Sequence, residues 1–138
     1  MSIFRNILVL VLVPVLGFNV ATAAAVDATS YQRDLVVAAR QVDPAFVADA
    51  ARGAAWFAAT HGSDWSCSSC HTGDPRKPGK HASTGKAISA LAPAITPTRF
   101  TDAAKSDKWF RRNCNDVVGR ECTAAERADV MAFLLNAN

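Results

Sequence analysis

The sequence predicts an all-α domain of about four helices. Several segments space their apolar residues by three and four, as amphipathic helices do, and no segment alternates apolar and polar residues as a strand would. Residues 62 to 97 are instead rich in Gly, Ser, Thr, Pro and Lys, and they are expected to form one long loop. A loop of this length is unusual in a compact domain unless something other than side-chain packing organises it.

The first 25 residues have the pattern of a secretory signal peptide. Arg5 supplies the positive charge near the start, an apolar run follows from Ile7 to Leu16, and small residues favour cleavage after Ala23 or Ala25. The apolar run is too short to span a membrane comfortably, so we expect a cleaved leader and not a retained anchor. The mature domain would comprise residues 26 to 138 and lie in the periplasm of a bacterium.

Length and charge limit the functional classes. Removal of a leader that contains only Arg5 reduces the 15 basic side chains to 14, against 12 acidic ones, which gives a formal charge of +2. This balance does not suggest a nucleic-acid-binding protein. The remaining length suits one domain with one modest core, and nothing in it requires an oligomer, so we expect a monomer.

Two helices are expected before the loop. The first lies within residues 26 to 43 and ends before Pro44, because the residue preceding a proline disfavours helical backbone angles. The second is expected from Pro44 to about Thr60, with Asp43 as its N-cap and Pro44 at the first helical position.

Two further helices are expected after the loop. Thr101 or Ser106 can cap the first of them, which would stop near Gly119. Thr123 and Glu126 have the spacing of a capping box and would open the last helix. The apolar residues at helical spacing on its expected buried side are Val130, Met131, Phe133, Leu134 and Leu135.

The long loop contains the motif Cys67-Ser68-Ser69-Cys70-His71. Two thiols at this spacing can add to the two vinyl groups of one haem, and the imidazole that follows can bind the iron as proximal ligand. A C-x-x-C pair alone could be a redox disulfide or half of a zinc site, but the adjacent His71 and the exported character of the chain favour covalent haem c. Because two helices follow the motif, we expect a class I cytochrome c-like arrangement, since the four-helix type carries this motif near its C-terminus.

The remaining two cysteines are Cys114 and Cys122. In an oxidising compartment they would most simply pair with each other, since Cys67 and Cys70 are consumed by the haem.

The sixth ligand of the iron decides between functions, and the residue pattern leaves it open. Met131 would give a plain electron carrier, but its position in the last helix also suits a core residue. His81, ten residues after His71, would give a carrier with two histidine ligands, and His61 is expected at a helix end. The spacing of the residues alone does not favour Asn113 as the sixth ligand, because asparagine commonly occupies helix ends.

Three runs of residues resemble the sphaeroides haem protein family of small bacterial cytochromes c. They are Arg99-Phe100-Thr101-Asp102, Lys108-Trp109-Phe110-Arg111-Arg112-Asn113-Cys114-Asn115-Asp116, and Gly119-Arg120-Glu121-Cys122-Thr123. The likeness extends over about residues 45 to 135 and includes the haem-attachment motif. It implies that Asn113 is the sixth iron ligand, that Cys114 pairs with Cys122, and that the electron donor is a di-haem cytochrome c or a membrane cytochrome b.

An asparagine ligand predicts a specific kind of function. An amide oxygen is a weak, hard donor that suits ferric iron better than ferrous iron, so reduction should loosen it and admit O₂, NO or CO. We therefore expect a mono-haem cytochrome c that accepts electrons and binds diatomic ligands, with electron transfer or ligand binding favoured over catalysis. A plain carrier with Met131 or His81 as ligand, and a small oxidoreductase that handles NO or O₂, are the competing interpretations.

Basic side chains could guide an acidic partner to the haem edge. The candidates are Arg76, Lys77, Lys80, Lys86, Arg111 and Arg112. A solvated basic loop explains the same residues equally well.

Overall fold

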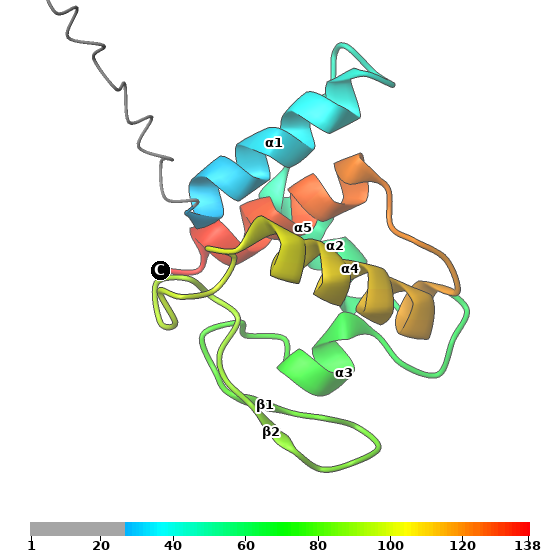
Figure 1. Ribbon diagram of the computed structural model, residues 1–138. Coiled ribbons are helices and arrows are strands. Elements are labelled where there is room, and N and C mark those ends of the chain that lie inside the picture. The colour runs from blue at the N-terminus through cyan, green and yellow to red at the C-terminus, as the bar shows by residue number, and fades with distance from the viewer. Residues whose placement is uncertain (1–26) are drawn as a thin grey trace, which may run out of the picture.

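The computed structural model describes residues 27–138, and it confirms the all-α fold (Figure 1). The expected signal peptide lies outside these residues. The described part forms five helices and two short strands: α1 (Ala28–Arg40), α2 (Ala50–Ala58), α3 (Cys67–His71), β1 (Gly79–Lys80), β2 (Ala87–Ile88), α4 (Ala103–Val118) and α5 (Ala124–Asn136). Among residues 27–138, no helix has the length and apolar character needed to cross a membrane.

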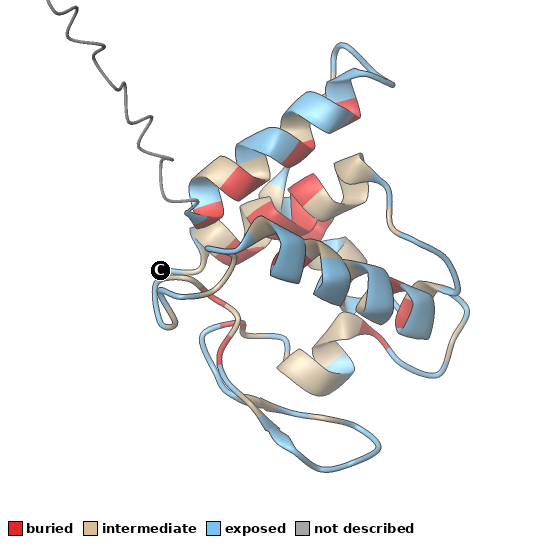
Figure 2. Cartoon of the chain, in the orientation of Figure 1, coloured by how far each residue is buried: buried red, intermediate tan, exposed pale blue. Residues whose placement is uncertain are grey.

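Helix α5 is the centre of the core, and α1 and α2 pack closely against it (Figure 2). Met131 and Leu134 of α5 are almost completely buried. Where α2 crosses α5, a Cβ on Gly53 would lie 2.0 Å from the carbonyl oxygen of Asp129, so only glycine permits this approach. The buried core cluster contains Ala28, Tyr31, Leu35, Phe57, Ala128, Val130, Met131 and Leu134.

Helix α5 begins as the sequence predicts. The Thr123 side chain accepts a hydrogen bond from the Glu126 backbone N–H, and the Glu126 carboxylate accepts one from the Thr123 N–H at 2.8 Å. This capping box satisfies two backbone donors at the helix start. Of the five residues expected on its buried side, Val130, Met131 and Leu134 are fully buried, whereas Phe133 and Leu135 are only partly covered.

The expected start of the second helix is wrong, because α2 begins at Ala50 and not at Pro44. Its N-cap is Asp49, whose side chain accepts a hydrogen bond from the Arg52 backbone N–H. Before it, Arg40 donates to the carbonyl of Phe46 at 3.0 Å and Arg52 donates to that of Val47 at 2.8 Å. In a helix that began at Pro44, these carbonyls would accept hydrogen bonds from backbone N–H groups four residues later. Because the arginine side chains bind them instead, the segment before α2 is irregular.

Helix α4 also has a different N-cap from either expected residue. The cap is Asp102, which accepts a bond from the Lys105 N–H, while the Ser106 hydroxyl donates back to the Asp102 carbonyl. At its C-terminal end, Gly119 adopts a left-handed conformation with φ of 74°, as expected for a helix that stops there.

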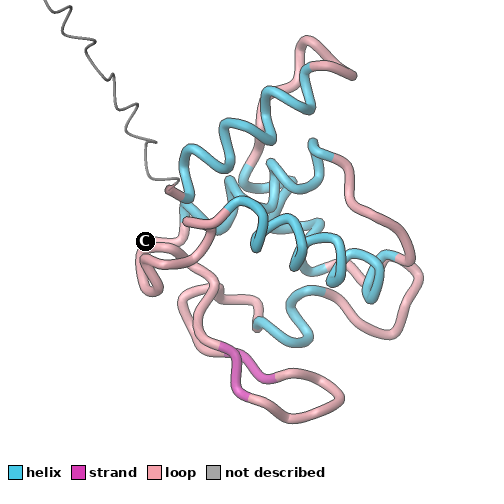
Figure 3. Tube along the Cα trace, in the orientation of Figure 1, coloured by secondary structure: helices cyan, strands magenta, loops and turns pink. Residues whose placement is uncertain are grey.

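The segment expected as one unstructured loop contains α3 and a small antiparallel hairpin of β1 and β2 (Figure 3). The close contact between the hairpin and α3 depends on Gly79 of β1, since a Cβ there would lie 2.0 Å from the carbonyl oxygen of Cys70. In the view of Figure 1, α3 and the hairpin lie below α4, and α1 lies above it. The hairpin therefore returns the chain onto the C-x-x-C-H motif.

Candidate functional site

The C-x-x-C-H motif forms the whole of helix α3. Ser66 is its N-cap and makes a capping box with Ser69, which gives this five-residue helix a defined start. Cys67 and Cys70 are three positions apart, so both thiols project from neighbouring positions on one helical face. His71 is the last residue of the helix. The local sequence thus places the two attachment thiols and the proximal imidazole within little more than one turn.

The side chains of α3 have the chemical state that haem c requires. Cys67 and Cys70 are free thiols, and burial raises the pKa of Cys67 to about 11. Burial, and then the charges of Arg99 and His81, lower the pKa of His71 to about 4, so its imidazole is neutral at physiological pH. Iron binds the neutral imidazole.

His71 also has a buried polar atom without a partner. Its Nδ1 makes no hydrogen bond with any of residues 27–138, and buried polar atoms of this kind usually have one. The ring packs against Phe57, with centroids 6.3 Å apart. A half-buried, neutral imidazole beside two free thiols fits the proximal ligand of a covalently held haem.

The hairpin brings His81 into the electrostatic range of His71. The Ala82 backbone N–H donates to the Sγ of Cys70 at 3.3 Å, which fixes the hairpin beside α3. The Nδ1 of His81 accepts a hydrogen bond from the Thr84 backbone N–H at 3.3 Å. His81 is therefore held by its own loop on the α3 side.

Met131 and His61 both already have contacts within the protein. Met131 is completely buried within the core cluster around α5. His61 follows α2, where its Nε2 lies 2.9 Å from the Trp56 carbonyl oxygen and its ring packs on the Trp56 indole at a centroid distance of 3.9 Å. Both side chains thus already have packing or hydrogen-bonding partners.

Asn113 lies near the end of α4 and is half-buried. Within residues 27–138 its side-chain amide takes part in no hydrogen bond, although the next side chain, Cys114, is buried. Asn115, two positions on, is exposed to solvent. Asn113 therefore occupies the boundary between the covered and the exposed faces of α4, with its amide available to a further partner.

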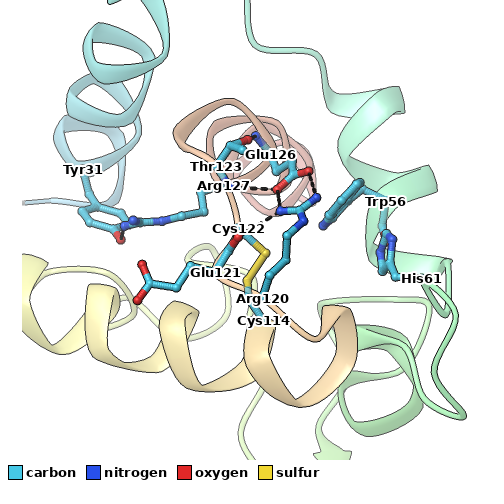
Figure 4. The surroundings of a disulfide bond; sticks show 10 residues. All are labelled: Tyr31, Trp56, His61, Cys114, Arg120, Glu121, Cys122, Thr123, Glu126 and Arg127. Carbon is cyan, nitrogen blue, oxygen red and sulfur yellow. Dashed lines mark hydrogen bonds and ion pairs between the residues drawn. A yellow bond between two sulfur atoms is a disulfide. The ribbon is translucent and has the colours of Figure 1, made fainter. Parts of the chain in front are cut away.

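The disulfide links the end of α4 to the start of α5 (Figure 4). Cys114 and Cys122 are bonded with their Cα atoms 5.7 Å apart. Arg120, in the loop that this bond closes, forms an ion pair with Glu126 at 2.7 Å, so the loop is also attached to the first turn of α5. The backbone directly beside Asn113 is consequently fixed by a covalent bond and by an ion pair.

A partly buried polar cluster holds the first half of α4. The Tyr31 hydroxyl of α1 donates to the Asp107 carboxylate at 2.7 Å, and Arg127 of α5 pairs with that carboxylate and donates to the Tyr31 oxygen. The Tyr31 ring stacks with Phe100 and Phe110 at centroid distances of 6.3 and 6.4 Å. This cluster, the packing of Ala103 and Phe110 on the core and the disulfide attach α4 to the rest of the domain.

The expected basic cluster is only partly free. Arg76 forms an ion pair with Asp74 at 2.9 Å, so part of its charge is already balanced. Lys77, Lys80 and Lys86 are exposed around the hairpin, and Arg111 and Arg112 are exposed on α4. The free cations thus come from two elements that are distant in sequence.

Sequence reasoning missed Arg99 as a site residue. Its charge acts on His71, and it is partly buried with no carboxylate partner among residues 27–138. The run Arg99-Phe100-Thr101-Asp102 resembles the family but assigns no role to the arginine. No periodicity or motif indicates this position, because the proximity arises from the fold of the loop.

Comparison with known proteins finds relatives in the same family of small cytochromes c that the sequence resembles. Residues 44–134 match a family described as a domain of unknown function, DUF1924. The cytochrome c-type protein SHP of Cereibacter sphaeroides is 48% identical over 91 residues, which cover 63% of this chain and 70% of that protein. The structure of oxidized SHP, an oxygen-binding cytochrome c, matches with a TM-score of 0.71 at 41% identity, over 80% of this chain and 97% of that one.

A second relative is cytochrome c'' of Methylophilus methylotrophus. It is 42% identical over 79 residues, which cover 57% of this chain and 55% of that protein, so the sequence match spans little more than half of the relative's length. Its solution structure, which is described as giving insight into haem-ligand detachment, matches this chain with a TM-score of 0.69 at 32% identity. The match covers 79% of this chain and 92% of that one. Both relatives are cytochromes c, which makes haem c the cofactor of this fold.

Proposed function

We propose that this chain, which belongs to the DUF1924 family and to the sphaeroides haem protein family of cytochromes c, accepts electrons and binds diatomic ligands at its ferrous haem. Asn113 would be the sixth ligand of the ferric iron and would leave on reduction. The observation that carries the proposal is the side chain of Asn113, which is half-buried and forms no hydrogen bond with any of residues 27–138.

The roles of the chain's own residues follow from their surroundings. Bound haem c would supply a redox-active iron. Cys67 and Cys70 would hold the haem through thioether bonds, and the neutral imidazole of His71 would bind its iron. The amide oxygen of Asn113 would be a weak donor that suits ferric iron better than ferrous iron. The disulfide would keep Asn113 close to this position in either redox state.

Three observations support a displaceable ligand over a permanent one. Met131 is enclosed in the core, and moving it to the iron would open a cavity around α5. Each relative is described in compatible terms, since SHP binds oxygen and cytochrome c'' undergoes haem-ligand detachment. A plain carrier would need His81 to leave its hairpin contacts.

The proposal includes a periplasmic location and a di-haem cytochrome c or membrane cytochrome b as electron donor. The apolar leader pattern of residues 1 to 25 supports export. The exposed cations of the hairpin and of α4 suit an acidic donor surface. Turnover of NO or O₂ at the same open position is the second candidate, and it needs no residue beyond those already named.

The test is the absorption spectrum of purified holoprotein in the ferric state, in the ferrous state without oxygen, and after addition of CO. We expect a six-coordinate ferric haem, a high-spin ferrous haem and rapid CO binding. Asn113→Leu should lose the six-coordinate ferric spectrum and still bind CO, whereas the matched variant Asn115→Leu should behave as the wild type. A low-spin ferrous spectrum that CO does not change would show a permanent strong ligand and refute the proposal.

A further inference from the structure

Arg99 forms no ion pair with any of residues 27–138, and it differs from the other unpaired arginines of this part, Arg33, Arg40, Arg111 and Arg112, because it is not exposed. Four other arginines form ion pairs among residues 27–138: Arg52 with Asp129, Arg76 with Asp74, Arg120 with Glu126 and Arg127 with Asp107. Arg99 belongs to none of these pairs. It is also partly buried, and this burial lowers the pKa of its guanidinium. A partly buried charge without a partner is unfavourable, so such a group usually marks an interaction with something else.

The guanidinium of Arg99 is held in a defined orientation. Its Nε donates to the carbonyl of Ala90 at 3.1 Å, and its Nη2 donates to that of Ser89 at 2.7 Å. A guanidinium has five N–H groups in one plane, so two bonds fix the plane and leave the remaining N–H groups free to donate. The two carbonyls are neutral and do not balance the charge. The arrangement is that of a pre-oriented donor for a carboxylate.

The position of Arg99 identifies which carboxylate it would meet. Its two acceptors, the carbonyls of Ser89 and Ala90, are followed at once by Leu91 and Ala92, whose backbone N–H groups donate to the carbonyl of Pro75 at 3.0 and 2.9 Å, four residues after His71. Ser89 and Ala90 directly follow β2 of the hairpin that rests on α3. No side-chain carboxylate among residues 27–138 pairs with Arg99. Haem c, the cofactor of this fold, carries two propionate carboxylates.

We propose that Arg99 binds one haem propionate as its counter-charge and thereby keeps that propionate ionised. The bond orients the haem relative to α3 and connects it to the chain after the hairpin. Arg99 is thus a positioning residue for the haem. The inference depends on the haem alone and is independent of whether Asn113 is the sixth ligand.

The experiment reads the propionates directly. Expression in the presence of 5-aminolevulinate labelled with ¹³C in its carboxyl group labels the propionate carboxyls of the holoprotein, so infrared spectra at different pH values separate their ionised and protonated forms. The histidines of α3 and of the hairpin, His71 and His81, carry no label and do not contribute to this signal. In the wild type, one propionate should remain ionised well below the pH at which an ordinary carboxylic acid takes up a proton.

Arg99→Gln should raise the pKa of that propionate by at least one unit, and Arg99→Lys should restore most of the difference because it returns the positive charge. Arg33→Gln, which removes the same charge from the exposed face of α1, should leave both propionates unchanged. Equal titration of both wild-type propionates in the ordinary carboxylic-acid range would overturn the proposal even if Arg99→Gln did not fold. Identical titration of Arg99→Gln and the wild type would overturn it as well.

Discussion

Removal of the Cys114–Cys122 disulfide should destabilise the protein by an amount that the loop length sets. The two cysteines are eight positions apart. In the chain-entropy model a cross-link across a loop of this size stabilises by about 2.5 kcal/mol, because it restricts the unfolded chain. Cys114 is buried, so alanine is the better replacement, since a serine hydroxyl there would lack a partner.

The surrounding loop limits how much else is lost. Arg120 and Glu126 still join this loop to α5, but half of the Arg120 side chain is exposed, so solvent screens the pair and its contribution to stability is small. We therefore expect Cys114→Ala/Cys122→Ala to lose about 2–3 kcal/mol, and Arg120→Ala to lose clearly less.

The assay is equilibrium unfolding of the ferric holoprotein in urea. With a slope of about 1–3 kcal/mol per molar, the midpoint of the double variant should fall by about 1–2 M, and its slope should rise because the unfolded chain is less restricted. A loss no greater than that of Arg120→Ala would refute the chain-entropy reasoning. An unchanged ferric spectrum in the double variant would further show that the disulfide only stabilises the fold and does not position Asn113.

Two further predictions concern Gly79, which lies against α3, and Tyr31 in the core. Gly79→Ala should displace the hairpin and reduce the yield of protein with covalent haem, because the new Cβ would lie only 2.0 Å from the carbonyl oxygen of Cys70. Haem content is measured by absorbance per protein mass, and a normal value would contradict this prediction. Burial first, and then the hydrogen bond to Asp107, raise the pKa of Tyr31 above its usual value of 10.0, so stability should be full below that pH and fall as the pH rises further. Because Tyr31 is the one tyrosine in the sequence, its tyrosinate absorbance should appear only together with unfolding in an alkaline titration, and earlier ionisation in a folded protein would show that the phenol is accessible.

The sequence predicted correctly the helix start that depends on neighbouring residues. It did not predict the helix start that depends on a contact with a residue far away in the sequence. The capping box of Thr123 and Glu126 is local, and α5 begins there as expected. The start of α2 instead depends on Asp129, which is 80 positions beyond Asp49. Asp129 accepts hydrogen bonds from the Asp49 backbone N–H at 2.8 Å and from the Arg52 side chain, so it holds the cap and the first turn of α2 against α5. The pattern before Ala50 contains no information about this partner.

The same distinction applies to the site. The motif from Cys67 to His71 is contiguous, and its chemistry could be inferred from spacing alone. The proposed role of Asn113 could be inferred only through family resemblance, because the lack of a hydrogen bond from its side chain to any of residues 27–138 is visible only in three dimensions. Arg99 had no local signal, since its proposed role follows from the lack of a carboxylate partner within residues 27–138 and from its bonds to the chain that follows the hairpin. A cofactor that organises a long loop thus leaves its covalent anchors in the sequence pattern, whereas the groups that balance its charge are recognised only from unpaired charges in the fold.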